Sequence, residues 1–240
     1  MIEKKPDWLK VRYNQEAIDE VAELMRDLNL NTVCKEANCP NLGECYRKHT
    51  ATFMILGSIC TRNCRFCNVC CGRPMPPNPQ EPENVAKAVK HLHLKHVVLT
   101  CSTRDDLTDG GARQFANTVN AIRELCPHTT VETLISDMKG DRNSLDIVLE
   151  VKPDVLNHNV ETVRELQKEI RPQAGYESSL GVLRYCKEKM PDMRVKTGFM
   201  VGLGETEEQI ETLLDDVLAT GCDILTIGQY LQPTPKHYPL

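Results

Sequence analysis

From Ala51 onward, the sequence alternates between short strand-like runs and amphipathic helical patterns, and this alternation constrains the fold more than any other feature. Six segments have the composition of β-strands: Thr52–Leu56, His96–Thr100, Thr130–Ile135, Asp154–Asn157, Arg194–Val201 and Asp223–Ile227. A helical pattern lies between each of these segments and the next. Because parallel strands need long crossover connections, the alternation predicts a parallel α/β sheet. Such crossovers are right-handed, so the strands should curl one way with the helices outside.

The helices are predicted from apolar residues that recur every three or four positions. The clearest is the last, which begins with the capping box Thr206-Glu-Glu-Gln209 and ends at Gly221. The other expected helices run from Asn14 to about Leu28, from Glu83 to His93, around Phe115–Ile122, from about Asp141, and over Glu177–Lys189.

Two segments lack a helical or strand period. Residues 31–50 combine cysteines with Pro, Asn and Gly, which predicts a loop that carries ligands. Residues 75–82 are rich in proline, which predicts a stiff, extended linker. Six strand–helix units are too few for a closed eight-stranded barrel, so an open partial barrel or a doubly wound sheet remains. In either architecture, ligands bind at the C-terminal ends of the strands.

Charge and composition exclude several classes of function. The net charge of −5 gives no basic surface for nucleic acid or for a membrane. No apolar run is long enough to span a bilayer, and the first residues lack the apolar core of a signal peptide. We therefore expect a cytoplasmic protein that binds neither nucleic acid nor membrane.

Cysteine is strongly over-represented and clustered. The chain has twelve cysteines, eight of which lie between Cys34 and Cys71. Secreted disulfide scaffolds are usually short and lack a large core, whereas here a long α/β pattern follows the cluster. The clustering therefore favours ligation of a metal or an iron–sulfur cluster.

The motif CTRNCRFC holds Cys60, Cys64 and Cys67 at C-x3-C-x2-C spacing, directly after the first strand. Three thiolates around a cluster of four irons leave one iron open to a small molecule. The alternative is a zinc site completed by Cys70, Cys71 or a histidine, but the position at a strand end favours the cluster.

This motif after the first strand of a parallel sheet resembles the signature of the radical S-adenosylmethionine (SAM) superfamily. The resemblance implies a partial (β/α)6 parallel barrel of radical SAM type with an N-terminal cluster-binding extension. A [4Fe–4S] cluster on Cys60, Cys64 and Cys67 would bind SAM through its fourth iron. The implied divisions are an extension over residues 1–50, a barrel over 51–232, and a C-terminal segment of which 233–240 is the start.

A second triplet, Cys34, Cys39 and Cys45, has C-x4-C-x5-C spacing, which is not common for zinc. It resembles the auxiliary-cluster motif of the lipoyl synthase family. Further similar segments cover nearly the whole chain: KPDWLKVR from Lys5, TATFMILG from Thr50, RDDLTDGGA from Arg104, NHNVET from Asn157, GLGET from Gly202 and GQYLQPTPKH from Gly228.

The resemblance implies a radical SAM sulfurtransferase with two [4Fe–4S] clusters. It would insert sulfur at C6 and C8 of an octanoyl group on a lipoyl carrier domain, and the sulfur would come from the cluster on the second triplet. The carrier would be the glycine cleavage H protein or a 2-oxoacid dehydrogenase E2, and the electron donor a flavodoxin or ferredoxin. The alternatives are another auxiliary-cluster radical SAM enzyme, a non-catalytic zinc or cluster module, and an inactive fragment.

The same resemblance suggests contacts to SAM. The expected residues are Asn159, Glu161, Arg171, Lys196, Gly110 and Gly111. Each has a simpler interpretation: Glu161 and Arg171 could form an ordinary ion pair, and Lys196 could be a solvated strand residue. The carboxylates of Asp105, Asp106 and Asp109 are better explained by loop structure and helix capping than by a metal site.

Two departures from the family pattern concern the remaining cysteines and the C-terminus. The family continues past the position of Leu240 to an Arg-Ser-Ser-Tyr motif whose serine completes the auxiliary cluster, so we expect a missing C-terminal segment. Cys70, Cys71 and Cys101 are not typical of the family. We interpret them as inert buried thiols, with replacement of the serine as the alternative.

Overall fold

The structure is a computed structural model that describes residues 15–36 and 50–240. Its main sheet contains six parallel strands that follow each other in sequence order and in space. They are β2 (Thr50–Ile55), β5 (His96–Cys101), β6 (Thr130–Leu134), β7 (Val155–Asn157), β8 (Arg194–Val201) and β9 (Ile224–Gln229). The six predicted strands and their parallel order are confirmed.

A seventh strand was not expected. β1 (Asn31–Thr32) pairs antiparallel with β2 and is followed by the short helix α2 (Val33–Glu36). The prediction of a loop from residue 31 is therefore wrong at its start. Two strand residues are too few to produce an alternating pattern, and the pairing depends on the exposed edge of β2.

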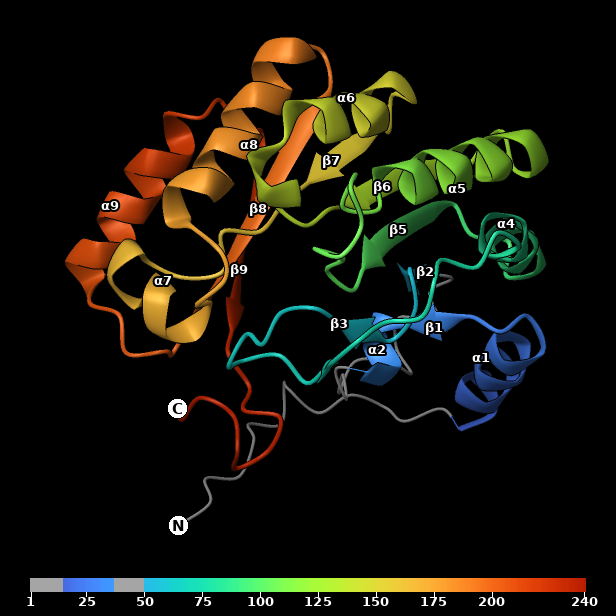
Figure 1. Ribbon diagram of the computed structural model, residues 1–240, viewed down its shortest axis with the longest axis horizontal. Coiled ribbons are helices and arrows are strands. Elements are labelled where there is room, and N and C mark those ends of the chain that lie inside the picture. Colours follow the sequence, from blue (N-terminus) through green and yellow to red (C-terminus); the bar gives the residue numbers. More distant parts are fainter. Residues whose placement is uncertain (1–14, 37–49) are drawn as a thin grey trace.

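Helices cover the outer side of the sheet, while the loop with β3 and the C-terminal residues lie below the strand ends (Figure 1). The helices are α1 (Gln15–Asp27), α4 (Glu81–His91), α5 (Ala112–Leu125), α6 (Arg142–Glu150), α8 (Tyr176–Lys189) and α9 (Glu207–Leu218). The capping box at Thr206 is present, as predicted. Apolar strand residues such as Phe53, Leu99 and Val195 are fully buried beneath these helices.

Short elements account for the other differences. α4 begins at Glu81, so the proline-rich linker ends sooner than predicted; Pro82 fits the first helical turn because its missing N–H has no partner there. The helix α7 (Arg164–Ile170) and the 3-10 turn η2 (Met138–Gly140) were not predicted, because seven and three residues are too few to show an apolar stripe clearly.

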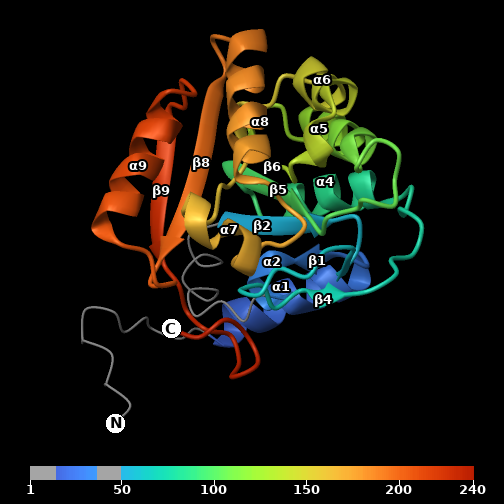
Figure 2. The same cartoon turned by 60° about the vertical axis from the view of Figure 1, so that its left-hand side comes forward.

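The sheet curves around an interior that opens at the C-terminal ends of the strands. Figure 2 shows β8 and β9 standing beside α8 and α9, with β1 and α1 at the opposite end of the sheet. None of the helices within the described ranges has the length and apolar composition needed to cross a membrane.

Candidate functional site

The cysteine motif forms a loop that is closed by its own small ladder. After β2, the chain enters β3 (Ile59–Cys60) and returns as β4 (Cys70–Cys71), which pairs parallel with β3. The backbone N–H of Gly72 donates to the carbonyl of Cys60 at 2.9 Å. Cys64 and Cys67 lie between the two short strands, so the ladder fixes both ends of the motif.

A buried polar cluster holds the turn from which this loop starts. Leu56 has a φ of 68°, a left-handed conformation that is unusual for a leucine. The carboxylate of Glu81 accepts a hydrogen bond from the Leu56 N–H at 2.9 Å. Arg104 and Ser102 donate to the Leu56 carbonyl at 3.2 and 3.4 Å. These contacts fix the direction in which the chain leaves the strand.

Later residues cover the outer side of the loop. The N–H of Tyr238 donates to the carbonyl of Arg65 at 2.9 Å, and the Arg65 guanidinium lies over the Tyr238 ring at 4.9 Å from its centroid. The imidazole of His237 lies 3.2 Å from the carbonyl of Cys67. The cysteine loop is therefore packed between the strand ends and residues 236–238.

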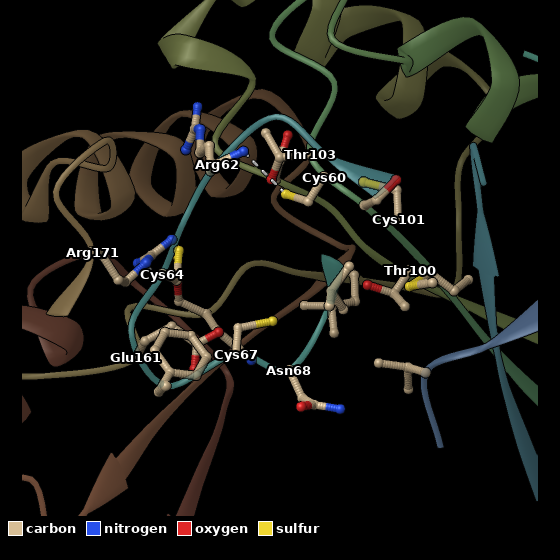
Figure 3. Close-up of a pocket in the computed structure, with 18 of the residues that line it drawn as sticks. Cys60, Arg62, Cys64, Cys67, Asn68, Thr100, Cys101, Thr103, Glu161 and Arg171 are labelled. Carbon is tan, nitrogen blue, oxygen red and sulfur yellow. Dashed lines mark hydrogen bonds between the residues drawn. The ribbon is translucent and has the colours of Figure 1, made fainter. Parts of the chain in front are cut away.

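A cavity of about 380 Å³ lies at the C-terminal ends of the strands, under the cysteine loop. Its wall contains six of the residues predicted to bind the cluster or SAM: Cys60, Cys64, Cys67, Asn159, Glu161 and Arg171. Figure 3 shows Arg171 and Glu161 on one side of these thiols, and Thr100 and Cys101 on the other. The structure thus brings together side chains separated by more than ninety positions in the sequence.

The three thiols of the motif line the same cavity and are potential donors to a metal centre or a cluster. Burial raises the pKa of Cys64, and it raises the pKa of Cys67 to about 11. A metal centre would keep such groups as thiolates.

Arg171 and Glu161 form a polar part of the cavity wall beside Cys64 and Cys67 (Figure 3). Arg171 Nη1 donates to the carbonyl of Val160 at 2.9 Å and to that of Asn159 at 3.3 Å. Its buried Nε has no hydrogen-bond partner among the described residues. Burial raises the pKa of Glu161, whose backbone is left-handed with a φ of 73°. The guanidinium thus rests on carbonyls, and the ordinary ion pair considered for these two residues does not form.

Three of the predicted SAM contacts lie outside the cavity wall. Lys196 does not line the cavity; its half-buried side chain binds Glu132 with an Nζ–Oε1 distance of 2.9 Å. Gly110 lines a separate hollow with Lys139, and Gly111 precedes α5 and packs against Leu56. A role of these three residues in binding SAM has no support from the cavity.

The aspartates of the loop after β5 have structural partners. Asp109 accepts hydrogen bonds from the N–H groups of Gly111 and Arg113 at the start of α5. Asp106 pairs with Arg104 at 2.8 Å, and this contact lowers the pKa of Asp106. These bonds agree with the expected roles in loop structure and helix capping.

Two further residues line the cavity: Arg62, which the sequence did not single out, and Cys101, which we interpreted as an inert buried thiol. Arg62 is 5% exposed and pairs with Asp105 at 2.7 Å and with Asp137 at 2.6 Å. Burial alone would lower the pKa of Arg62, but the hydrogen bonds and charges of these carboxylates outweigh it and raise the pKa. Cys101 lines the cavity, and burial raises its pKa to about 12. No sequence signal identified Arg62 except its place between two cysteines.

The other cysteines that the sequence analysis singled out divide into three groups. Cys70 and Cys71 are exposed, so their interpretation as buried thiols is wrong. Cys34 is buried in α2, and its neighbour Val33 lines the cavity. The other two cysteines predicted to hold the second cluster, Cys39 and Cys45, lie outside the described residues.

Comparison with known proteins identifies relatives over the whole chain. The family model described as the radical SAM superfamily matches residues 54–217. A protein named lipoyl synthase from Geobacillus kaustophilus is 55% identical, over 98% of this chain and 79% of its own length. The lipoyl synthase of Bacillus subtilis is 52% identical over the same shares. That of Caldicellulosiruptor saccharolyticus is 51% identical, over 99% of this chain and 84% of its own length.

Solved structures with the same fold are more distant in sequence. Methylornithine synthase (PylB) superposes with a TM-score of 0.62 at 18% identity, covering 88% of this chain and 64% of its own. The hydrogenase maturase HydG has a TM-score of 0.63 at 14% identity, covering 91% of this chain and 55% of its own. These similarities confirm the partial barrel.

Proposed function

Because the chain belongs to the lipoyl synthase family of radical SAM enzymes, we propose that Cys60, Cys64 and Cys67 hold the [4Fe–4S] cluster at which SAM binds. The reaction is the insertion of two sulfur atoms, at C6 and C8 of a protein-bound octanoyl group. The observation that carries the assignment of residues is the cavity at the strand ends, whose wall contains these three cysteines together with Asn159 and Arg171.

The residues present fit the cofactors. Cys60, Cys64 and Cys67 line one cavity and supply the three thiolates of a cluster with one open iron. The buried Nε of Arg171 lacks a partner among the described residues, and a buried donor of this kind requires an acceptor. A carboxylate of a bound amino acid supplies that acceptor, as the methionine part of SAM would.

Each side chain then has a defined task. When bound, the cluster and SAM supply the one-electron chemistry that removes hydrogen atoms from unactivated carbons. Arg171 holds the carboxylate of SAM, while Glu161 and Asn159 accept hydrogen bonds from its amine and ribose. The backbone N–H of Glu161 donates to the carbonyl of Gly198 at 3.0 Å, and this hydrogen bond fixes Glu161 against β8. Gly198 has no side chain to displace Asn159, whose Oδ1 would lie 3.1 Å from an added Cβ.

Apolar residues of the same wall keep water away from the reacting carbons. Met54, Leu134 and Met200 project from β2, from β6 and from β8 into the cavity. An octanoyl chain is apolar, so burying it against these residues is favourable and excludes solvent.

The sulfur comes from a second cluster, which is a substrate of the reaction because it is consumed. We assign it to Cys34, Cys39 and Cys45. Val33 lies in the cavity wall directly before Cys34, so the described start of this triplet adjoins the space in which the octanoyl chain would lie. An alkyl radical needs a sulfur atom within reach, and this placement supports such an approach.

The carrier of the octanoyl group is a lipoyl carrier protein. We assign it to the glycine cleavage H protein or a 2-oxoacid dehydrogenase E2, and the reductant to a flavodoxin or ferredoxin. Each of these follows from the chemistry of the family, and co-purified carriers or reductants that support turnover would identify the natural ones.

The test uses anaerobically reconstituted protein. We expect about eight irons and eight sulfides per chain, and about four of each in Cys64→Ala. Cys71→Ala is the matched control, because Cys71 is exposed and lies in the same loop, and it should keep all of them. With SAM and an octanoylated carrier peptide, the mass of the peptide should increase by two sulfur atoms. Zinc without sulfide would contradict the proposal, and 5′-deoxyadenosine without sulfur in the peptide would point to another radical SAM reaction.

A further inference from the structure

Arg62 lies inside the cysteine motif, yet its side chain binds neither a thiol nor solvent. Its guanidinium contacts two carboxylates on two different loops. Nε and Nη2 donate to Asp105, after β5, at 2.7 and 2.9 Å. Nη1 and Nη2 donate to Asp137, after β6, at 3.0 and 2.6 Å. Both contacts are bidentate, which is the strongest and most directional form of arginine–carboxylate pairing.

Both aspartates make further hydrogen bonds, Asp105 through its backbone N–H and Asp137 through its carboxylate. The N–H of Asp105 donates to the hydroxyl of Thr61 at 3.0 Å, and that hydroxyl donates to the carbonyl of Thr103. Asp137 accepts a further hydrogen bond from the N–H of Lys139 at 3.0 Å, and its side chain is 3% exposed. Arg62 therefore fastens the cysteine loop to two fixed points on the barrel.

The backbone of the same residue faces the thiols. The N–H of Arg62 donates to Sγ of Cys60 at 3.4 Å. Figure 3 shows this bond as a dashed line, with the guanidinium directed away from the cysteines. All but one of the N–H donors of the guanidinium are used by the two aspartates, so it has no bidentate face left for a ligand.

We propose that Arg62 is a positioning residue, which locks the cysteine loop onto the barrel and thereby holds its own amide against the sulfur of Cys60. This inference rests on the proposed function, since it takes Cys60 as a cluster ligand. Hydrogen bonds to ligand sulfurs are one of the factors that set the potential of an iron–sulfur cluster. Arg62 thus controls both the retention of the cluster and its potential without touching it through its side chain.

A second arginine of the motif shows by contrast why burial matters. Arg65 pairs with Glu169 at 3.0 Å, but the two side chains are 47% and 54% exposed. Exposed pairs of this kind contribute little to stability. Removing one partner of a buried pair has a much larger effect, because the other charge is left without compensation. The side chain of Arg62 is buried in its pairs, so its removal should have the larger effect.

The experiment compares Arg62→Met and Arg62→Lys with the exposed Arg113→Met as control. Each reconstituted protein is transferred anaerobically to an iron chelator, and iron release is followed by absorbance. We expect release from Arg62→Met to be about tenfold faster or more, with a smaller increase for Arg62→Lys and none for Arg113→Met. The reduction potential of the SAM-binding cluster, measured by spectroscopic titration, should become more negative in the two Arg62 variants and stay unchanged in Arg113→Met.

Asp137→Asn provides an independent test if Arg62→Met fails to fold. It keeps the shape of the side chain and removes the charge that pairs with Arg62, so iron release should accelerate and the potential should fall in the same direction. Wild-type release and wild-type potential in both Arg62→Met and Asp137→Asn would overturn the proposal. Absence of iron and sulfide from the wild-type protein would instead refute the proposed function, so the two failures are distinguishable.

Discussion

Gly111, expected from the sequence to line the methionine end of SAM, has a structural role that a single substitution can test. Its φ is 93°, a conformation that L-residues with a side chain rarely adopt. An added Cβ would lie 2.2 Å from Cδ1 of Leu56, which is 3% exposed and has little freedom to move. Gly111→Ala should therefore destabilise the fold even without SAM.

The magnitude follows from two terms. A left-handed conformation at a residue with a side chain costs about 1–2 kcal/mol, and forcing extra volume into a packed core costs about 1–3 kcal/mol. The free energy of unfolding should fall by about 2–5 kcal/mol, and each kcal/mol lowers the melting temperature of a chain of this size by about 2–4 °C. The expected shift is thus large enough for routine measurement.

Two other glycines allow the conformational cost and the packing cost to be measured separately. Gly204 has a φ of 101° with no atom within 4 Å of an added Cβ, so Gly204→Ala should lose only the conformational term. Gly181 lies in α8 with open space around it and no positive φ, so Gly181→Ala should stabilise the protein by about 0.5–1 kcal/mol.

The assay is thermal unfolding followed by far-UV circular dichroism, without SAM, in preparations of equal iron content. The reasoning predicts the order of melting temperatures Gly181→Ala, wild type, Gly204→Ala, Gly111→Ala, from highest to lowest. If Gly111→Ala melted with the wild type and lost only SAM affinity, the packing argument would be refuted and the role in cofactor binding would stand.

Three further substitutions test buried polar groups. Burial alone would raise the pKa of Glu132, but hydrogen bonds, the first from His96, lower it from 4.5 to about 2. Glu132 therefore contributes about 3 kcal/mol to the free energy of unfolding above pH 4.5, and this contribution is lost as the pH falls toward 2. The free energy of unfolding of Glu132→Gln in urea should depend less steeply on pH in that range than that of the wild type. Burial lowers the pKa of His158 from 6.5 to about 4, so the free energy of unfolding should fall as the pH drops through this interval. In His158→Gln, the free energy of unfolding should depend less on pH over the same interval. Glu81→Met leaves the N–H of Leu56 unpaired and should destabilise the protein by about 1–3 kcal/mol in urea unfolding at neutral pH, while equal stability would contradict the proposed anchoring of the turn.

The parts of the fold that could be predicted are those with repeated signals. Helical patterns separate each of the six parallel strands from the next, and four adjacent residues from Thr206 form a capping box that marks the start of its helix. By contrast, β1 has two residues and α2 has four, which is only about one period of a strand or helix pattern and too short to recognise. Their formation depends on the free edge of β2, which is a tertiary property.

The candidate site divides in the same way. The spacing of Cys60, Cys64 and Cys67 is local and could be recognised in the sequence alone. The partners of Arg62 lie 43 and 75 positions away, so no local pattern connects them. Lys196 was chosen because it lies on a strand near the predicted site, but β8 directs it to the carboxylate of Glu132. The direction of a side chain within a curved sheet depends on the strand register, and this register cannot be read from the sequence alone.

The packing of residues 236–238 on the cysteine loop has a consequence for biosynthesis. His237 meets the carbonyl of Cys67 across 170 positions of sequence. Those residues leave the ribosome only after all six parallel strands have been made, and non-local contacts of this kind form late in folding. Until then, the outer side of the cysteine loop lacks this cover, so iron and sulfide bound to the loop at an earlier stage of synthesis would be open to solvent on that side.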